Sequence, residues 1–190
     1  VVTRLLVGSM RRVGQDVAGL GGDVESVTTS VVATAETKVL QEEVTLRAEF
    51  EGGAINSLND TSSRVINRFS GNGKIRGFEP NGIGPRDLAS ATQDALGGNF
   101  FAVARFEAEF PLGLPEEYGI TGGVFADVGS VWGLDNPGVV DDSLNLRSSI
   151  GVSVFWNTPI GPLRFNFSKA LQKEDYDEEQ TFDLTVSTRF

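Results

Sequence analysis

Residues 99–110 alternate strictly between two kinds of side chain. The even positions are all apolar, whereas the odd positions include Arg105, Glu107 and Glu109. Successive side chains of a strand point to opposite faces of a sheet, so this pattern predicts a strand with one apolar and one polar side. A strand between lipid and the polar lumen of a transmembrane barrel has this pattern.

The same alternation recurs along the chain, whereas helical periodicity is weak. We predict about eight strands, which lie within residues 1–18, 27–36, 43–50, 99–110, 120–132, 144–156, 163–168 and 181–190. In the last of these, the apolar positions include Phe182, Leu184, Val186 and Phe190. The sequence therefore predicts an all-β protein with an antiparallel transmembrane β-barrel over residues 1–190.

The connections between these strands alternate in length. Short connections are expected at 37–42, 111–117 and 157–161, and longer ones at 51–98, 133–143 and 172–179, with 19–23 as a short exception. Short turns at one end and long loops at the other are typical of outer-membrane barrels. A soluble β-sandwich is the alternative, but it does not require this asymmetry. In the last loop we expect a solvated acidic surface at Glu174, Asp175, Asp177, Glu178 and Glu179.

Composition limits the functions that the chain can have. The net charge is −10, which argues against nucleic acid as a partner. The sequence has no Cys and no His, so thiol chemistry, the usual zinc ligands and the commonest general base are missing. We therefore predict no metal, no cofactor and no enzymatic activity. Because Val1 is not an initiator methionine, we also expect that the chain was trimmed or taken from a longer one.

The predicted loop 51–98 contains a basic segment among glycines and prolines. Arg76 precedes Gly77, and glycine allows close approach of the backbone to a neighbouring surface. The guanidinium is a planar group with five donors that suits binding to carboxylates. A solvated loop arginine is the alternative interpretation.

The segment Ile75-Arg76-Gly77-Phe78 resembles the V/I-R-G-F motif of the BamA family of outer-membrane insertases. Further stretches resemble the family in the same order: Asn81-Gly82-Ile83-Gly84-Pro85, Gly97-Gly98-Asn99, Phe125 to Trp132, Pro159 to Phe165, and the terminal Phe190. The resemblance implies a sixteen-stranded barrel preceded by periplasmic POTRA domains, of which this chain would be the C-terminal half. It also implies that 51–98 is an extracellular loop folded into the lumen, where Arg76 meets Glu107 and Asp127.

The function implied by the resemblance is the insertion and folding of β-barrel proteins in the bacterial outer membrane, without a catalytic residue. The alternatives are a TamA-like autotransporter assembly factor and a two-partner secretion pore. Implied partners are outer-membrane lipids, nascent barrel substrates, accessory lipoproteins, and the N-terminal half-barrel and POTRA domains of the same protein. The last strand, with Phe182, Leu184, Val186 and Phe190, would supply one side of the barrel seam and the assembly signal.

Overall fold

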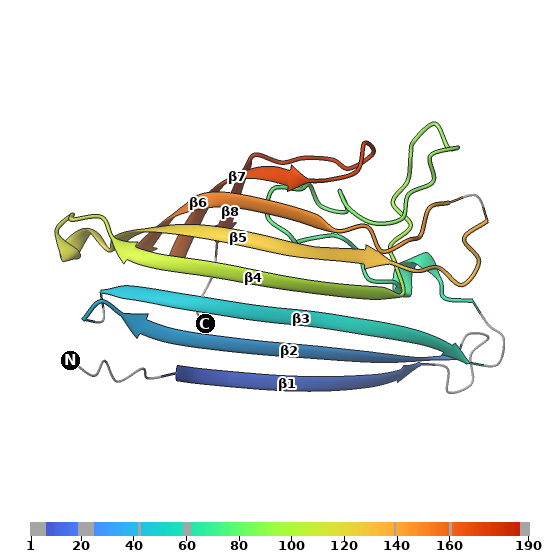
Figure 1. Cartoon of the computed structure of the whole chain (residues 1–190), viewed down its shortest axis with the longest axis horizontal. Coiled ribbons are helices and arrows are strands. Elements are labelled where there is room, and N and C mark those ends of the chain that lie inside the picture. Colours follow the sequence, from blue (N-terminus) through green and yellow to red (C-terminus); the bar gives the residue numbers. More distant parts are fainter. Residues whose placement is uncertain are drawn as a thin grey trace.

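A single antiparallel sheet of eight strands forms the body of the molecule (Figure 1). The computed structural model describes residues 7–18, 25–41, 43–58, 62–138, 140–159 and 161–186. The strands follow one another in chain order: β1 (Val7–Ala18), β2 (Glu25–Val39), β3 (Val44–Leu58), β4 (Phe100–Pro111), β5 (Ile120–Trp132), β6 (Arg147–Thr158), β7 (Gly161–Gln172) and β8 (Phe182–Val186). Two short 3-10 turns lie in the connections, η1 (Val65–Asn67) and η2 (Glu116–Tyr118).

The register keeps the apolar parity of every strand on the same side of the sheet. Ala104 lies opposite Val128, and Val152 lies opposite Val124 on one side and Phe167 on the other. Each pairing is antiparallel, so neighbouring strands need only a hairpin connection. The alternation predicted from the sequence therefore becomes two chemically distinct faces of one sheet.

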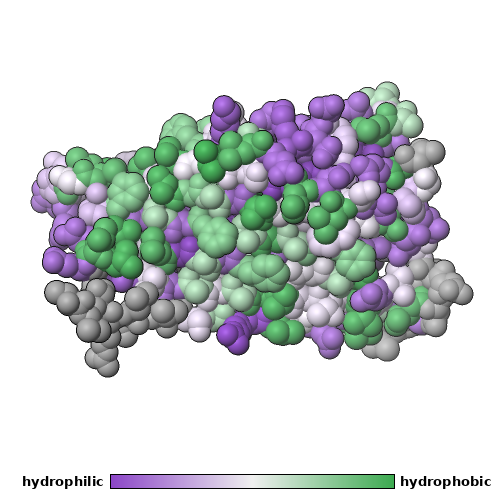
Figure 2. Space-filling view, in the orientation of Figure 1, coloured by the Kyte–Doolittle hydropathy of each residue, from purple (hydrophilic) through white to green (hydrophobic). Residues whose placement is uncertain are grey.

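The outer face of the sheet is apolar and exposed. Phe106, Val152 and Phe167 are 52%, 51% and 50% exposed, respectively. Figure 2 shows hydrophobic side chains spread over the sheet, and hydrophilic ones gathered near the end where the long loops lie. A continuous apolar face of this extent needs a nonpolar surrounding.

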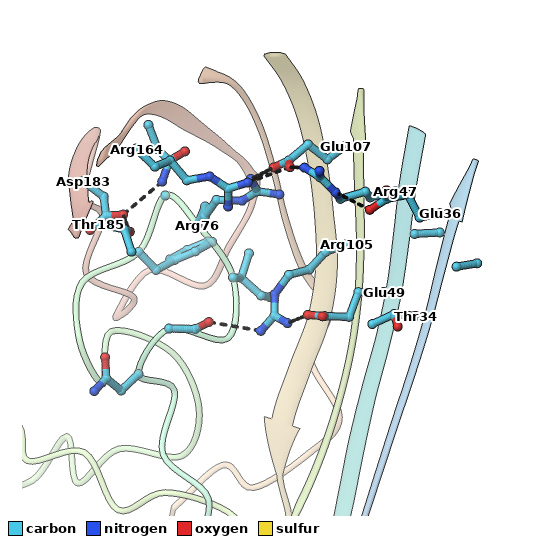
Figure 3. Close-up of a pocket in the computed structure, with 18 of the residues that line it drawn as sticks. Thr34, Glu36, Arg47, Glu49, Arg76, Arg105, Glu107, Arg164, Asp183 and Thr185 are labelled. Atoms are coloured by element: carbon cyan, nitrogen blue, oxygen red, sulfur yellow. Dashed lines mark hydrogen bonds and ion pairs between the residues drawn. The ribbon is translucent and has the colours of Figure 1, made fainter. Parts of the chain in front are cut away.

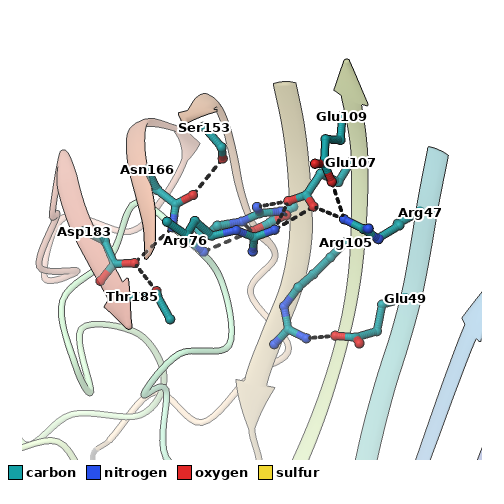
Figure 4. Close-up of polar contacts among 12 residues, drawn as sticks. Arg47, Glu49, Arg76, Arg105, Glu107, Glu109, Ser153, Asn166, Asp183 and Thr185 are labelled. Carbon is teal, nitrogen blue, oxygen red and sulfur yellow. Dashed lines mark hydrogen bonds and ion pairs between the residues drawn. The ribbon is translucent and has the colours of Figure 1, made fainter. Parts of the chain in front are cut away.

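The inner face is covered near the loop end of the sheet by the long β3–β4 connection. Ile75, Phe78 and Ile83 of this connection form a buried cluster with Phe101, Val103 and Val131 of the sheet. Hence the inner parity of β4 begins with apolar residues that contact the loop, and becomes charged only farther along the strand. The sheet curls around this packed loop (Figure 4).

Strand β3 is longer than the sequence predicted, because Glu51 to Leu58 belongs to the strand and not to the loop. Gly53 makes room for two aromatic rings inside this strand. A Cβ on Gly53 would lie 2.5 Å from Phe101 Cε1 and 2.6 Å from Phe69 Cζ. Gly53 therefore serves close packing in the strand, which ends at Leu58.

Two later strands also differ from their predicted limits. Strand β6 starts at Arg147 and not at residue 144, because Asn145 donates its backbone N–H to Ser143 and its side-chain amide to Asp141. Such local hydrogen bonds compete with strand pairing. Strand β7 continues to Gln172, beyond its predicted end. Among the described residues, no helix is long and apolar enough to cross a membrane.

Candidate functional site

Arg76 lies inside the curled sheet and contacts two carboxylates of its wall (Figures 3 and 4). Its Nε and Nη2 donate to Oδ2 and Oδ1 of Asp127 at 2.8 and 2.7 Å. Its Nη1 donates to Oε2 of Glu107 at 2.6 Å. The backbone N–H of Arg76 also donates to Asp127 Oδ2 at 3.1 Å. The two-pronged contact with Asp127 is the strong, directional form of an arginine–carboxylate pair.

Burial strengthens this contact and makes each partner dependent on the other. The Asp127 side chain is fully buried, and that of Arg76 is 13% exposed. The guanidinium carbon also lies 3.7 Å from the centre of the Phe125 ring, which adds a cation–π contact. Burial alone would lower the pKa of Arg76, but its hydrogen bonds to Asp127 and Glu107 raise the pKa above its ordinary value. Arg76 is therefore a permanent cation held between two anions.

The two carboxylates come from adjacent strands of the same face. In the β4–β5 register Glu107 lies opposite Phe125, and Asp127 lies two residues farther along β5. Glu107 has a second close cation, because Arg164 Nη2 on β7 donates to its two oxygens at 2.6 and 2.7 Å. Glu107 thus links the loop to β7 across the interior of the sheet.

A second cluster holds the chain just before Arg76. Arg105 of β4 donates to the carbonyl oxygens of Gly73 and Lys74 at 3.1 and 3.0 Å, and it is itself paired with Glu49 and Glu51 of β3. Lys74 Nζ lies 3.0 Å from Glu51 Oε1 and 3.7 Å from the centre of the Phe101 ring. We had not predicted this cluster, although Arg105 lies on the polar parity of its strand and could have suggested it.

The neighbours of Arg76 in the motif fit the wall closely. Gly77 has a φ of +94°, and a Cβ at this position would lie 3.2 Å from Ser149 Cβ and 3.4 Å from Ser168 Cβ. Glycine is therefore favoured both by backbone conformation and by close approach. Ile75 and Phe78 on either side are 2% and 6% exposed.

The chain after Arg76 pairs with residues that precede β8. Phe78 and Glu179 form an antiparallel bridge, in which Glu79 N–H donates to Glu178 O at 2.9 Å and Gln180 N–H donates to Gly77 O at 3.1 Å. The buried Arg86 also reaches Glu178, with its Nη1 2.9 Å from Oε1. The loop is therefore anchored before, at and after Arg76.

The β7–β8 loop is not the fully solvated acidic surface that we predicted. Asp177 is buried and paired with Arg147 of β6, whose Nε and Nη2 donate to its oxygens at 2.9 and 3.0 Å. Asp177 Oδ2 also accepts the backbone N–H of Glu174 at 2.8 Å, so it orders its own loop. The prediction was wrong for Asp177 because a run of acidic residues gives no sign of which one turns inward. Glu178 and Glu179 remain exposed.

The predicted residues of the last strand lie away from the Arg76 cluster. Phe182, Leu184 and Val186 project from the outer face of β8 and are about half exposed. Phe190, the fourth predicted residue, lies outside the described part of the chain.

A cavity of about 920 Å³ adjoins the Arg76 cluster (Figure 3). Its lining includes the polar side chains of Arg76, Glu107, Arg164, Asn166 and Asp183. In the described part of the chain, no three His, Cys, Asp or Glu side chains are grouped so as to hold a metal ion. The arrangement is suited to holding a loop against a wall through charge-assisted hydrogen bonds.

Comparisons with known proteins agree on one family. Residues 7–190 match the Omp85 superfamily domain. The chain is 37% identical over 180 residues to the outer membrane protein assembly factor BamA of Neorickettsia risticii, and 29% identical over 143 residues to that of Neisseria meningitidis serogroup B. The matches cover 94% and 63% of this chain, respectively.

A solved structure has the same fold. The crystal structure of BamA from Haemophilus ducreyi lacking POTRA domains 1-3 superposes with a TM-score of 0.83 at 22% identity, over 96% of this chain and 38% of that one. The chain spans 24% of the length of the Neorickettsia relative and 18% of the Neisseria one. The chain therefore belongs to the Omp85 superfamily and forms part of a β-barrel protein of the bacterial outer membrane.

Proposed function

We propose that this chain is the C-terminal half of the barrel of an outer-membrane assembly factor, which inserts and folds other β-barrel proteins. The observation that carries the proposal is the likeness to BamA over almost the whole chain, at 37% identity to a curated relative. The insertion and folding of a barrel protein need no covalent step. It needs a membrane-embedded sheet with an edge to which a strand can be added, and an interior firm enough to keep that edge in place.

In this proposal the contacts of Arg76 with Asp127 and Glu107 act as a latch. They hold the β3–β4 loop, an extracellular loop, inside the lumen. Leaving Asp127 without a cation would place an unpaired charge at a fully buried position, which is strongly unfavourable. The latch therefore favours one position of the loop over all others. Ile75, Gly77 and Phe78 help it by fitting the loop to the wall.

The proposed partners follow from this role. The outer face contacts outer-membrane lipids, and nascent barrel proteins are the substrates. The N-terminal half-barrel and the POTRA domains belong to the same protein, and accessory lipoproteins bind to it. No nucleic acid, cofactor or catalytic residue takes part in this function.

The test uses the full-length protein reconstituted in liposomes. An unfolded outer-membrane barrel protein is added as client, and its folding is followed by protease resistance. The proposal predicts faster client folding than in liposomes alone. An equal rate, together with a steady ionic current through the reconstituted protein, would favour the secretion pore instead. Acceleration restricted to autotransporter clients would favour the TamA-like alternative.

A further inference from the structure

The stretch Gly97-Gly98-Asn99 leads from the β3–β4 loop into β4. Gly97 has a φ of +65°, a conformation that favours glycine. A Cβ on Gly98 would lie 2.5 Å from Trp132 O, so the two backbones meet too closely there for any other residue. The chain is therefore held against the end of β5, and Asn99, which is 3% exposed, has a fixed place at the start of β4.

Asp135 of the β5–β6 connection joins the two ends of the β3–β4 loop. Its Oδ2 accepts the backbone N–H of Ser63 at 2.6 Å, and its Oδ1 accepts the side-chain amide of Asn99 at 3.0 Å. Ser63 Oγ donates in turn to Asn99 Oδ1 at 2.7 Å, although these two residues are 36 positions apart in the chain. The three residues form a closed triangle of hydrogen bonds. We call Ser63, Asn99 and Asp135 the neck of the loop.

The β5–β6 connection holds Asp135 in place at the neck. Asp142 Oδ2 accepts the backbone N–H of Leu134 at 2.8 Å, and Asp142 O accepts that of Gly133 at 2.9 Å. Gly133 O accepts the backbone N–H of Asn99 at 2.8 Å, so this turn is bound to the end of the loop as well. The carboxylate of Asp135 is therefore presented to the neck by a turn that has hydrogen bonds of its own.

The neck depends on Asp135, although Asp135 itself is exposed. Ser63 and Asn99 are only 5% and 3% exposed, so their N–H groups have little access to water as a substitute acceptor. Partial burial alone would raise the pKa of Asp135, but hydrogen bonds from Ser63 and Asn99 lower it below its ordinary value. Asp135 therefore accepts these hydrogen bonds as an anion, which makes them charge-assisted.

A path of contacts leads from the neck to the latch. Six residues after Ser63, the ring of Phe69 packs edge-on against Phe101, with 4.5 Å between the ring centres. Lys74 Nζ lies 3.7 Å from the centre of the same Phe101 ring. Lys74 comes two residues before Arg76 in the chain. The neck and the latch are thus connected through one aromatic ring of β4.

We propose that Asp135 is a positioning residue for the latch: by closing the neck, it holds the β3–β4 loop on the path along which Arg76 reaches Asp127. Fixing the start of a loop reduces the conformations open to the remainder, so less entropy is lost when the latch forms. Both connections lie at the same end of the sheet (Figure 1). The β5–β6 connection thereby controls the latch from that end. The inference rests on the proposed function only where client folding is concerned.

The experiment compares two aspartates of the β5–β6 connection in the full-length protein in liposomes. Asp135 and Asp141 are both exposed, and each accepts one backbone N–H and one asparagine side-chain amide. The partners of Asp141 are Ser143 and Asn145, which lie in its own connection. Asp141→Ala is therefore the matched control for Asp135→Ala.

Amide hydrogen exchange of residues 74–82 reports on the latch without any client. The backbone N–H of Arg76 donates to Asp127, so its exchange requires this contact to open. We expect Asp135→Ala to speed exchange in this segment at least about fivefold. Asp141→Ala should leave the exchange of the segment unchanged.

Asp135→Asn is a second variant, which carries the test if Asp135→Ala does not fold. It keeps an acceptor oxygen for Ser63 but turns an amide nitrogen toward the side-chain amide of Asn99. We expect it to speed exchange of residues 74–82 at least about twofold, the effect of one weakened hydrogen bond.

Client folding tests the consequence for function. The client is an unfolded outer-membrane barrel protein, and its folding is followed by protease resistance. We expect Asp135→Ala to slow client folding about fivefold, and to have no further effect in a protein that already carries Arg76→Ala. Substitutions at distant residues usually act additively, so the loss of the effect would show that Asp135 acts through the latch.

Each other outcome contradicts a defined part of the proposal. If both Asp135 variants speed exchange only near residues 57–63 and 99, or nowhere, the neck does not position the latch. If Asp141→Ala has the same effect as Asp135→Ala, the effect does not belong to the neck. If Asp135→Ala slows client folding equally with and without Arg76, it acts by another route. If no version of the protein accelerates client folding over liposomes alone, the proposed function fails, while faster exchange in the Asp135 variants still supports the role of the neck.

Discussion

At the scale of single residues, the identity of Arg76 matters more than its charge. Asp127 receives two side-chain hydrogen bonds and one backbone hydrogen bond from the same residue, and Glu107 receives a fourth. A lysine would supply a point charge and could not place donors on both carboxylates in this geometry. The planar guanidinium also packs on Phe125, which an ammonium group would do less extensively.

Replacement of Arg76 should therefore destabilise the barrel. We expect Arg76→Ala in the full-length protein to lower the free energy of unfolding by roughly 3 kcal/mol, because it leaves Asp127 buried without its partner. Arg76→Lys should recover only part of this loss. The measurement is urea unfolding in lipid, with the exposed Arg64 of the same loop replaced by alanine as the matched control.

A double-mutant cycle separates the pair from its surroundings. The combined change of Arg76→Ala and Asp127→Ala should cost less than the sum of the single changes, with a coupling energy of about 1 kcal/mol or more. Strict additivity would mean that the two residues contribute nothing as a pair.

Part of this cluster could be predicted from the sequence. Glu107 and Asp127 lie on the polar parity of their strands, and Arg76 lies beside a glycine in a long loop. Two sets of contacts were not predicted: those of Arg105 with Gly73 and Lys74, and the pair of Arg147 with Asp177. These contacts depend on which loop residue meets which strand. That information lies in the register and in the path of the loop, and neither follows from local pattern.

At the scale of elements, the β3–β4 loop behaves as a packed part of the barrel interior. Its apolar residues bury against Phe101, Val103 and Val131, and its backbone pairs with the segment before β8. The β7–β8 loop is stabilised in turn by Asp177, which bonds to Arg147 and to the backbone of Glu174. The two loops therefore support each other over the same end of the sheet.

Asp177 should stabilise this end of the sheet as strongly as Asp127 stabilises the interior. We expect Asp177→Ala to lower the free energy of unfolding by roughly 3 kcal/mol, since it leaves Arg147 buried and unpaired. Asp175→Ala, two residues away at an exposed position, should change it by less than about 0.5 kcal/mol. Equal effects of the two substitutions in urea unfolding would show that the buried pair has no special role.

The strands offer a separate prediction about their two faces. Ala104 and Val152 lie on the outer parity, whereas Val103 and Ser153 are buried on the inner one. Spin labels at the first two positions should be quenched by lipid-soluble oxygen more strongly than labels at the other two. Equal quenching at all four positions would contradict the orientation of the sheet in the membrane.

The presence of each strand and the side that its residues face could be predicted from the sequence, whereas several strand ends could not. Alternation is a direct consequence of strand geometry, so it marked all eight strands. Ends depend on packing with distant residues, as the close fit of Gly53 with Phe69 and Phe101 illustrates. Gly53, which the sequence placed in the loop, leaves the space in β3 that these two rings occupy.

At the scale of the whole molecule, the interior charges connect both sides of the curled sheet. Glu107 on β4 contacts Arg76 of the loop and Arg164 of β7, and Arg164 lies opposite Thr185 of β8 in the register. The loop is thus joined to the β7–β8 hairpin by two routes, through Glu107 with Arg164 and through the backbone hydrogen bond from Gln180 to Gly77.

Client folding by variants of the Arg76 latch shows whether the latched loop serves the assembly of client barrel proteins. Arg76→Ala, Asp127→Ala and their combination are compared in the full-length protein in liposomes, with Arg64→Ala as control and with the folded fraction of each variant measured first. We predict that either single change slows client folding at least about tenfold, that the combination is no slower, and that the control matches the unaltered protein. A folded Arg76→Ala protein that assembles the client at the unaltered rate would contradict a role of the latch in assembly.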